Sequence, residues 1–261
     1  MLFTALTVAG SDPSGGAGIQ ADLNTFAALG VYGMSVIVAL TAQNTTGVKD
    51  VMDVPAEFVA RQWDEVMSDI PAMSVKTGML GNEANVRTTA HMIEKYGVRH
   101  FVLDPVMVSS SGASLLAAPA VETLKRELAP RASVVTPNLA EAEILSGVDV
   151  HDKASMELAA RRIREFGPEF VLVKGGHLEG DALDILYDGS EFHYYRSARI
   201  GDSEIHGTGC VLSAAITACL ARGNTVYDAV RLAKDFVTEA IQNSYRVGRG
   251  ALPCNAAGLR F

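Results

Sequence analysis

The stretch "FTALTVAGSDPSGGAGIQAD", residues 3–22, joins an apolar run to a glycine-rich loop and then to a helical pattern. Apolar and β-branched residues up to Gly10 are typical of a buried strand, and the glycines and serines that follow are typical of a turn. The loop is not a P-loop, because no Gly-Lys-Ser/Thr follows it, and it fits the dinucleotide-binding glycine pattern poorly. We therefore predict a strand, a β-to-α turn and a helix.

The same alternation continues along the chain. Further strands are predicted at residues 34–40, 73–78, 100–106, 133–138 and 169–176, with amphipathic stretches between them. In residues 56–70, for example, Phe58, Trp63 and Ile70 fall on one helical face. Apolar strands separated by helices indicate a mostly parallel sheet covered on both faces. We predict a three-layer α/β/α fold.

The sequence of the last third of the chain predicts further strands at one edge of this sheet. Residues 183–198 carry an Asp-Gly turn between β-rich segments, which predicts a small hairpin at a sheet edge. The glycine- and proline-rich tail from residue 248 onward is predicted to be irregular. Because no repeat, low-complexity block or linker is present, we expect residues 1–261 to form a single domain.

Composition excludes several classes of function. The 261 residues are 48% hydrophobic and 20% charged, with a net charge of −8 and no Lys/Arg cluster, so we expect neither a nucleic-acid nor a membrane partner. The three cysteines form no CxxC pair, which argues against a zinc site or disulfide framework. The first ten residues predict a strand, not a signal peptide. We expect a cytoplasmic protein.

Five polar motifs directly follow predicted strands: "AGSDPSGGAG", "VKTGM", "LDPVM", "TPNLAEAE" and "VKGGH". In a parallel sheet these positions share the carboxyl edge, where α/β proteins bind ligands. In "LDPVM", Asp104 would face the cleft and contribute to a Mg²⁺ site through water. Met79, Val106 and Met107 are expected near the same edge, although such residues more often belong to the core.

For four polar residues at this edge, the sequence alone leaves the role open. Asn138 and Glu141 fit a helix cap and also a metal-orienting Asn-x-x-Glu pair, and the two roles are compatible. Asp22 is suggestive, but an acid in the first turn of a helix is favoured by the helix dipole whatever its function. Lys174 ends a buried strand without a nearby acid in the sequence, which favours a phosphate partner.

The segment "IHGTGC", residues 205–210, begins an apolar helix. The backbone N–H groups of Gly207, Thr208, Gly209 and Cys210 are the unpaired donors of its first turn, and glycines let an anion approach them. A glycine-rich helix start is weak evidence by itself. Together with the acidic edge and Lys174, it predicts a phosphate site.

These motifs, in their order and spacing from about residue 5 to residue 245, resemble the hydroxymethylpyrimidine/phosphomethylpyrimidine kinases of the ribokinase-like superfamily. The resemblance implies two ATP- and Mg²⁺-dependent steps of thiamine biosynthesis. The first phosphorylates 4-amino-5-hydroxymethyl-2-methylpyrimidine, and the second converts the monophosphate into the diphosphate. It also implies a homodimer. The substrate pocket maps onto Gln43, Gly10, Asp22, Met79 and Val106, with the Gln43 amide suited to an aminopyrimidine edge.

For the reaction itself, the resemblance maps nucleotide contacts onto Asn138, Lys174 and Thr208, and the anion hole onto Gly207 to Cys210. Where many relatives in the superfamily carry an aspartate base, this chain carries Cys210. We expect the helix N-terminus to lower the pKa of this thiol. The hypothesis is that Cys210 deprotonates the hydroxymethyl group in the first step, whereas the second step, with an anionic nucleophile, needs no base.

Three alternatives remain at this point. The nearest is a pyridoxine/pyridoxal kinase on the same fold, against which Gln43 and Met79 favour the pyrimidine. The second is a catalytically silent nucleotide-binding module, which commonly lacks one of the catalytic residues present here. The third is a cysteine-nucleophile hydrolase, for which His206 stands near Cys210 in sequence but no orienting third group is evident.

Overall fold

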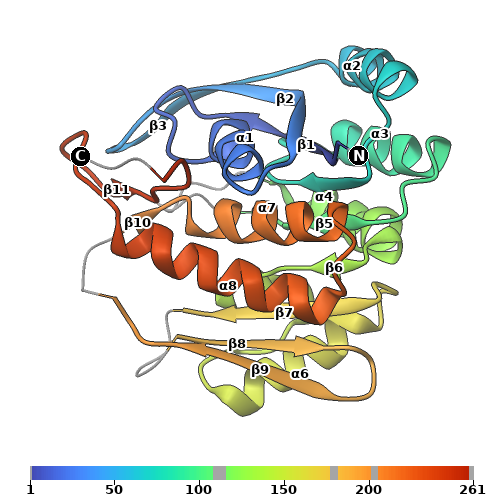
Figure 1. Ribbon diagram of the computed structural model, residues 1–261. Coiled ribbons are helices and arrows are strands. Elements are labelled where there is room, and N and C mark those ends of the chain that lie inside the picture. Colours follow the sequence, from blue (N-terminus) through green and yellow to red (C-terminus); the bar gives the residue numbers. More distant parts are fainter. Residues whose placement is uncertain (1, 108–115, 177–181, 201–204, 259–261) are drawn as a thin grey trace.

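The computed structural model describes residues 2–107, 116–176, 182–200 and 205–258. Within these ranges, nine strands form one sheet in the order β3-β2-β1-β4-β5-β6-β7-β8-β9 (Figure 1). The six strands from β2 to β7 in this order run parallel, while β3, β8 and β9 are antiparallel to their neighbours. The strand bounds are β1 Thr4–Ser11, β2 Tyr32–Asn44, β3 Gly47–Asp53, β4 Ser74–Thr77, β5 Phe101–Leu103, β6 Val134–Val135, β7 Phe170–Gly175, β8 Ala182–Tyr187 and β9 Phe192–Ser197.

Helices cover both faces of this sheet. One face carries α1 (Gly18–Ala28), α7 (Thr208–Ala221) and α8 (Val226–Gln242), which lie in front in Figure 1. The other carries α2 (Ala56–Asp69), α3 (Glu83–Lys95), α4 (Ala118–Thr123), α5 (Leu139–Ser146) and α6 (Lys153–Arg164), with a π-helical turn (Leu124–Leu128) and a 3₁₀ turn (Ala129–Arg131) after α4. The predicted three-layer α/β/α fold is confirmed.

Each face of the sheet has its own apolar core. Trp63 of α2 is fully buried in the core under α2, α3 and α6, and Ile70 packs against this core, as predicted. Phe58, which was predicted on the same face, is instead 50% exposed. On the opposite face, α7 is buried on all sides from Val211 to Ala221, because α1, α8 and the sheet surround it. The start of α7, where the glycine-rich turn lies, is thereby fixed against the sheet.

The edges of the sheet differ in part from the sequence prediction. The hairpin over 183–198 is confirmed as β8 and β9. At the other edge, β2 extends to Asn44 and turns back into β3, a ribbon that the polar sequence "TAQNTTGVKD" did not predict. The tail was predicted to be irregular, but Leu252–Pro253 (β11) pairs with Ile205–His206 (β10). Residues 108–112 of "LDPVMVSSSG" and His177 of "VKGGH" lie outside the described ranges.

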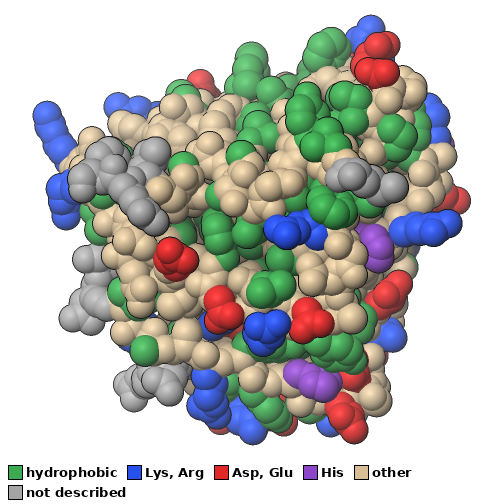
Figure 2. All heavy atoms as spheres, in the orientation of Figure 1, with side chains coloured by type: hydrophobic (Ala, Val, Ile, Leu, Met, Phe, Trp, Pro, Cys, Tyr) green, Lys and Arg blue, Asp and Glu red, His purple; other side chains and the backbone are tan. Residues whose placement is uncertain are grey.

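Charged side chains of both signs are interspersed on the face that carries α8 (Figure 2). Along this helix Arg231 pairs with Asp228 and Asp235 one turn to either side. Such i,i+3 and i,i+4 pairs stabilise a solvated helix face modestly. None of the helices in the described ranges combines the length and apolar character that a membrane span requires.

Candidate active site

A cleft of about 1100 Å³ opens at the carboxyl edge of the parallel strands, where the five polar motifs were predicted to meet. Its walls come from β1, β2, β4, β7, β8, α1, α5, α7 and α8 and from the loops between them. All the site residues predicted from the sequence line it: Gly10, Asp22, Gln43, Met79, Asp104, Val106, Asn138, Glu141, Lys174, Gly207, Thr208, Gly209 and Cys210. Met107, in contrast, is buried in the core.

One end of the cleft is built around Gln43. A register shift between Ala42 and Gln43 in the β2–β3 pairing marks a bulge, a device that re-aims a side chain. The amide oxygen of Gln43 accepts a hydrogen bond from the Thr41 hydroxyl at 3.3 Å. Gly10 and Met79 form the floor, since a Cβ added to Gly10 would lie 2.6 Å from Met79 Cε. This end offers an amide above an apolar floor.

Two residues beside Gln43 were missed as site residues. His206 Nε2 lies 3.2 Å from Gln43 Nε2 and 3.5 Å from Asp12 Oδ2. Asp12 closes the glycine-rich loop: its carboxylate accepts hydrogen bonds from the N–H and hydroxyl of Ser14 and from the N–H of Ala17. Burial would raise its pKa, but His206 and these donors lower it below the ordinary value. The Asx-turn pattern of "SDPS" was the available signal for Asp12.

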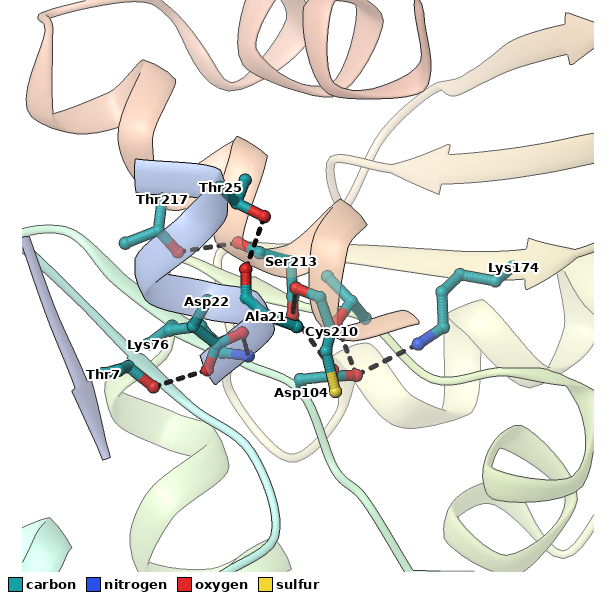
Figure 3. A network of polar contacts seen from close by, with 11 residues as sticks. Thr7, Ala21, Asp22, Thr25, Lys76, Asp104, Lys174, Cys210, Ser213 and Thr217 are labelled. Carbon is teal, nitrogen blue, oxygen red and sulfur yellow. Dashed lines mark hydrogen bonds and ion pairs between the residues drawn. The ribbon is translucent and has the colours of Figure 1, made fainter. Parts of the chain in front are cut away.

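We expected Asp22 in the first turn of its helix, but α1 begins at Gly18, so Asp22 lies in the second turn. Its carboxylate instead accepts hydrogen bonds from Lys76 Nζ at 2.8 Å and from the Thr7 hydroxyl at 2.6 Å (Figure 3). Lys76 and Asp22 are both fully buried. Although burial opposes charge on Lys76, the Asp22 carboxylate raises the lysine pKa. The pair joins α1 to β1 and β4 beneath the cleft.

Lys174 has an acidic partner, so the premise that no acid lies near it was wrong. Its Nζ donates to Asp104 Oδ1 at 3.0 Å, and Thr136 donates to the same oxygen at 3.2 Å. Ser213 of α7 donates to Asp104 Oδ2 at 3.0 Å (Figure 3). Burial lowers the pKa of Lys174, but Asp104 and Glu141 outweigh it and raise the pKa to about 12. Lys174 is therefore a fixed cation in the cleft.

The Asn138–Glu141 pair forms the predicted helix cap. Asn138 accepts from the Glu141 N–H at 2.9 Å, and the Glu141 carboxylate accepts from the Asn138 N–H at 2.8 Å. This capping box fixes the start of α5 at the cleft. Burial raises the pKa of Glu141 to about 7, against the opposing charge of Lys174. A cation arriving here would lower that pKa again.

The donors near Asp104 and Glu141 suit a Mg²⁺ ion held through water. Both Asp104 oxygens already accept hydrogen bonds, and Glu141 is tied into its cap. Within the described residues, no group of three or more His, Cys, Asp and Glu side chains is arranged to bind a metal. Mg²⁺ commonly keeps several waters and takes its other ligands from substrate phosphates. These carboxylates fit that mode, in which water lies between the ion and the protein.

The turn before α7 is shaped by Gly207. Its φ of +83° lies in the left-handed region, and an added Cβ would lie 1.9 Å from the Gly16 carbonyl oxygen. This contact packs the turn against the glycine-rich loop after β1. A Cβ on Gly209 would lie 3.2 Å from Lys174 Nζ, so the lysine stands beside the N–H groups at the start of α7. Helix N–H groups and a lysine together favour an anion.

The expected lowering of the Cys210 pKa is wrong. Burial raises the pKa of Cys210 to about 11, although the charge of Lys76 and a backbone N–H of Gly18 lower it. The thiol is half-buried at the start of α7, between the buried Lys76–Asp22 pair and Asp104 (Figure 3). Loss of solvation outweighs the helix dipole because the sulfur has little water around it. In this state Cys210 is a neutral thiol at pH 7.

The far end of the cleft was not predicted. It is lined by β8 and α8, where Lys234 Nζ pairs with Asp184 Oδ2 at 2.6 Å and both side chains are buried. Asp184 also accepts from the Gly175 N–H at 3.0 Å. Val237 and Ile241 add apolar surface beside this pair. Neither Lys234 nor Asp184 lies in a motif of the sequence, so only the packing of α8 on β8 reveals them.

Comparison with known proteins identifies related sequences. The family model described as phosphomethylpyrimidine kinase matches residues 12–255. The hydroxymethylpyrimidine/phosphomethylpyrimidine kinase of Streptomyces coelicolor is 48% identical over 248 residues, 95% of this chain and 92% of its own length. The thiamine biosynthesis bifunctional protein ThiED of Geobacter sulfurreducens is 50% identical over 253 residues, covering 97% of this chain. The chain spans 52% of that bifunctional protein.

Among solved structures, an ADP complex of Bacillus subtilis pyridoxal kinase superimposes with a TM-score of 0.91. The match covers 98% of both chains at 35% sequence identity. The ribokinase-like fold expected from the sequence is thereby confirmed. The sequence identity to the pyridoxal kinase is lower than that to the two thiamine-pathway relatives, 35% against 48% and 50%.

Proposed function

The chain belongs to the phosphomethylpyrimidine kinase family and is a phosphotransferase, and on this premise we propose the reaction that its cleft performs. The chain phosphorylates 4-amino-5-hydroxymethyl-2-methylpyrimidine with ATP and then phosphorylates the monophosphate to the diphosphate, in thiamine biosynthesis. One observation carries the proposal: an amide suited to an aminopyrimidine, a paired lysine and a helix N-terminus share one cleft.

The pyrimidine binds at the Gln43 end of the cleft. The amide of Gln43 has donor and acceptor atoms side by side, as an aminopyrimidine edge does. Gly10 and Met79 provide an apolar floor for the ring, and Val106 lies in the same wall. This placement directs the hydroxymethyl group toward the start of α7. Asp22 supports this end from below through its pair with Lys76 and lines the cleft only at its base.

The transferring phosphoryl group lies at the start of α7. The N–H groups of Thr208, Gly209 and Cys210 and the ammonium of Lys174 stabilise negative charge as the phosphoryl group moves. Asp104 holds the lysine in place, and Asn138 and Thr208 supply polar contacts to the nucleotide. Asp104 and Glu141 would hold Mg²⁺ through water, and the bound ion would neutralise charge on the phosphates. The adenine end of ATP extends toward β8 and α8.

Cys210 remains the candidate base for the first step. Burial keeps its thiol neutral at pH 7, so only the small thiolate fraction accepts the hydroxymethyl proton. Phosphoryl transfer through a loose transition state makes a modest demand on the base, because most of the charge lies on the phosphoryl oxygens. Positioning and charge stabilisation therefore carry most of the rate. The second step starts from an anionic phosphate and needs no base.

Two further properties belong to this proposal. The chain forms a homodimer in solution. Sedimentation equilibrium tests this, because the measured mass should be twice that of one chain. The reaction takes place in the cytoplasm; all three cysteines lie in described residues and are free thiols, in agreement with a reducing compartment.

Mass spectrometry of the products tests the proposed function. The purified protein is incubated with Mg-ATP and, separately, with the hydroxymethylpyrimidine or with pyridoxine. We expect the mono- and diphosphate of the pyrimidine and little pyridoxine phosphate. Phosphorylation of pyridoxine alone would make the chain a pyridoxine kinase on the same cleft and would contradict the role given to Gln43.

A further inference from the structure

His206 lies between two parts of the cleft, the Gln43 end and the turn at the start of α7. It is the last residue of β10, directly before Gly207 and the turn at the start of α7. Its side chain is 16% exposed, and its Nε2 atom lies 3.2 Å from Gln43 Nε2. The pyrimidine-binding amide and the anion-binding turn are therefore joined through one imidazole.

The surroundings of His206 leave its ring little freedom. A Cβ added to Gly16 would lie 2.9 Å from His206 Cδ2, so the glycine-rich loop packs directly on the ring. The backbone of His206 pairs with Pro253 in β11, and its carbonyl accepts from the Cys254 N–H at 3.0 Å. The glycine-rich loop thus holds the ring, and β11 holds the backbone.

Gln43, in contrast, has weak support of its own. It lies at a bulge near the end of an edge ribbon, and its Thr41 contact is long at 3.3 Å. A glutamine side chain has several rotatable bonds, and ordering it costs conformational entropy. Its amide can also present either its oxygen or its nitrogen to a ligand unless neighbours fix it. A second contact is needed to hold one orientation.

A hydrogen bond to His206 leaves the Gln43 amide able to bind a ligand. The amide nitrogen carries two N–H groups, and donating one of them to His206 leaves the second N–H and the carbonyl oxygen for a ligand. Asp12 lies farther from the imidazole, at 3.5 Å, and already accepts three hydrogen bonds within its own loop. In the tautomer that carries its proton on Nδ1, Nε2 accepts from the Gln43 amide at 3.2 Å; in the other tautomer the same nitrogen donates to Asp12.

We propose that His206 is a positioning residue that holds the Gln43 amide in the orientation that binds the pyrimidine. The inference rests on the proposed function, because it assigns a task toward the same substrate. His206 does not touch the transferring phosphoryl group in this scheme; it acts through Gln43. Its place directly before Gly207 keeps the bound ring at a fixed distance from the anion-binding turn, which favours reaction.

Calorimetric binding of the hydroxymethylpyrimidine, with steady-state kinetics, tests this role in the full-length protein. We expect His206→Phe, which keeps a ring but no acceptor, to raise Kd and KM about tenfold, the effect of one lost hydrogen bond, and to change kcat less. His206→Gln restores an acceptor near the position of Nε2 and should recover most of the affinity. His151→Phe, at an exposed histidine, is the matched control.

A double-mutant cycle separates positioning from general damage. If His206 acts through Gln43, adding His206→Phe to Gln43→Ala raises Kd no further. Additive effects, a fall in kcat with unchanged KM, or failure of His206→Gln to recover affinity would overturn the inference while the wild-type kinase remained active. If the wild-type protein neither binds nor phosphorylates the pyrimidine, the proposed function itself is wrong and the inference falls with it.

Discussion

Cys210 illustrates how a single residue can be well placed and still poorly ionised. The sequence puts it at a helix N-terminus, which favours a thiolate, but the folded chain removes water from around the sulfur. The loss of solvation is the larger effect, so the pKa rises to about 11. Cys210 is consequently a neutral thiol at pH 7, and only its small thiolate fraction can serve as the proposed base.

Removing the thiol should affect the two phosphorylations unequally. We expect Cys210→Ala to lower kcat of the first step by about 10²-fold, at the lower end of general-base effects, because the base is mismatched to neutral pH. The second step should lose less than about tenfold, since its nucleophile is already an anion. Separate assays starting from the alcohol and from the monophosphate measure both rates. Equal losses in the two steps would contradict the base assignment.

The raised pKa of Cys210 can be measured directly. Because folding raises this pKa above that of an ordinary thiol, the thiolate fraction at any pH below about 11 is smaller than in a free cysteine. The rate of Cys210 alkylation by iodoacetamide should therefore rise about tenfold per pH unit from pH 7 to pH 10, without a plateau. Peptide mass spectrometry follows the residue, with the unfolded chain as control. A plateau below pH 9 would show a lowered pKa instead.

At the scale of elements, α7 carries the candidate site at its first turn and is flanked by a left-handed glycine on each side. Gly207 (φ +83°) precedes it and Gly223 (φ +86°) follows it, but only at Gly207 would an added Cβ meet another atom, the Gly16 carbonyl oxygen. The two glycines therefore share the same backbone requirement and differ in their packing. Comparing the two glycines therefore distinguishes the cost of the left-handed backbone from the effect of packing the turn against Gly16.

Alanine substitutions at these two glycines use that difference. Each should cost about 1 kcal/mol of stability from the left-handed backbone. Gly207→Ala should also push the turn away from the glycine-rich loop and lower kcat/KM about 10²-fold, because a shift near 1 Å misplaces the anion-binding N–H groups. Gly223→Ala should keep near-normal activity. Urea unfolding and kinetics measure both variants; equal activity in the two would refute the packing argument.

The Lys76–Asp22 pair joins three elements, α1, β1 and β4, and its effect on stability can be predicted. We expect Lys76→Met to lower the free energy of unfolding by about 3–5 kcal/mol, because it leaves the Asp22 carboxylate buried and unpaired. The double variant Lys76→Met/Asp22→Leu should be less destabilised, since it removes both charges of the pair. Urea denaturation compares them. A double variant less stable than Lys76→Met would contradict this account.

For the whole molecule, the cleft brings together both ends of the chain. Elements from the first eighty residues, β1, β2 and β4, supply the Gln43 end, and β8 and α8 from beyond residue 180 supply the other. Ligands that bind the folded cleft therefore stabilise the entire fold, because the unfolded chain has no such site.

A thermal-shift experiment tests this dependence. At a free concentration 100 times its Kd, a ligand stabilises the fold by about 2.7 kcal/mol, which corresponds to about 5–10 °C in Tm for a chain of this size. We expect the pyrimidine and a non-hydrolysable ATP analogue with Mg²⁺ each to raise Tm, and both together to raise it further. A combined shift no larger than the larger single shift would mean that the two compete for one place.

The sequence by itself determined the layers of the fold and placed its polar motifs at one cleft. Strand and helix patterns depend on local periodicity, and parallel strands bring their carboxyl ends to one edge, so motifs such as "LDPVM" and "HGTGC" could be assigned to the cleft without coordinates. The β2–β3 ribbon was not predicted because β3 and the end of β2 are largely exposed and carry no regular apolar alternation; pairing between the two strands forms it.

Only the tertiary structure decided which side chains pair in the cleft and whether Cys210 is charged. Lys174 meets Asp104, Lys76 meets Asp22 and His206 meets Gln43 across 70, 54 and 163 positions of sequence, respectively, and no local pattern encodes such pairs. The pKa of Cys210 likewise depends on how much water the assembled elements exclude. Hydrogen bonding and solvation act over a few ångströms in space, and chain folding alone determines which residues come that close.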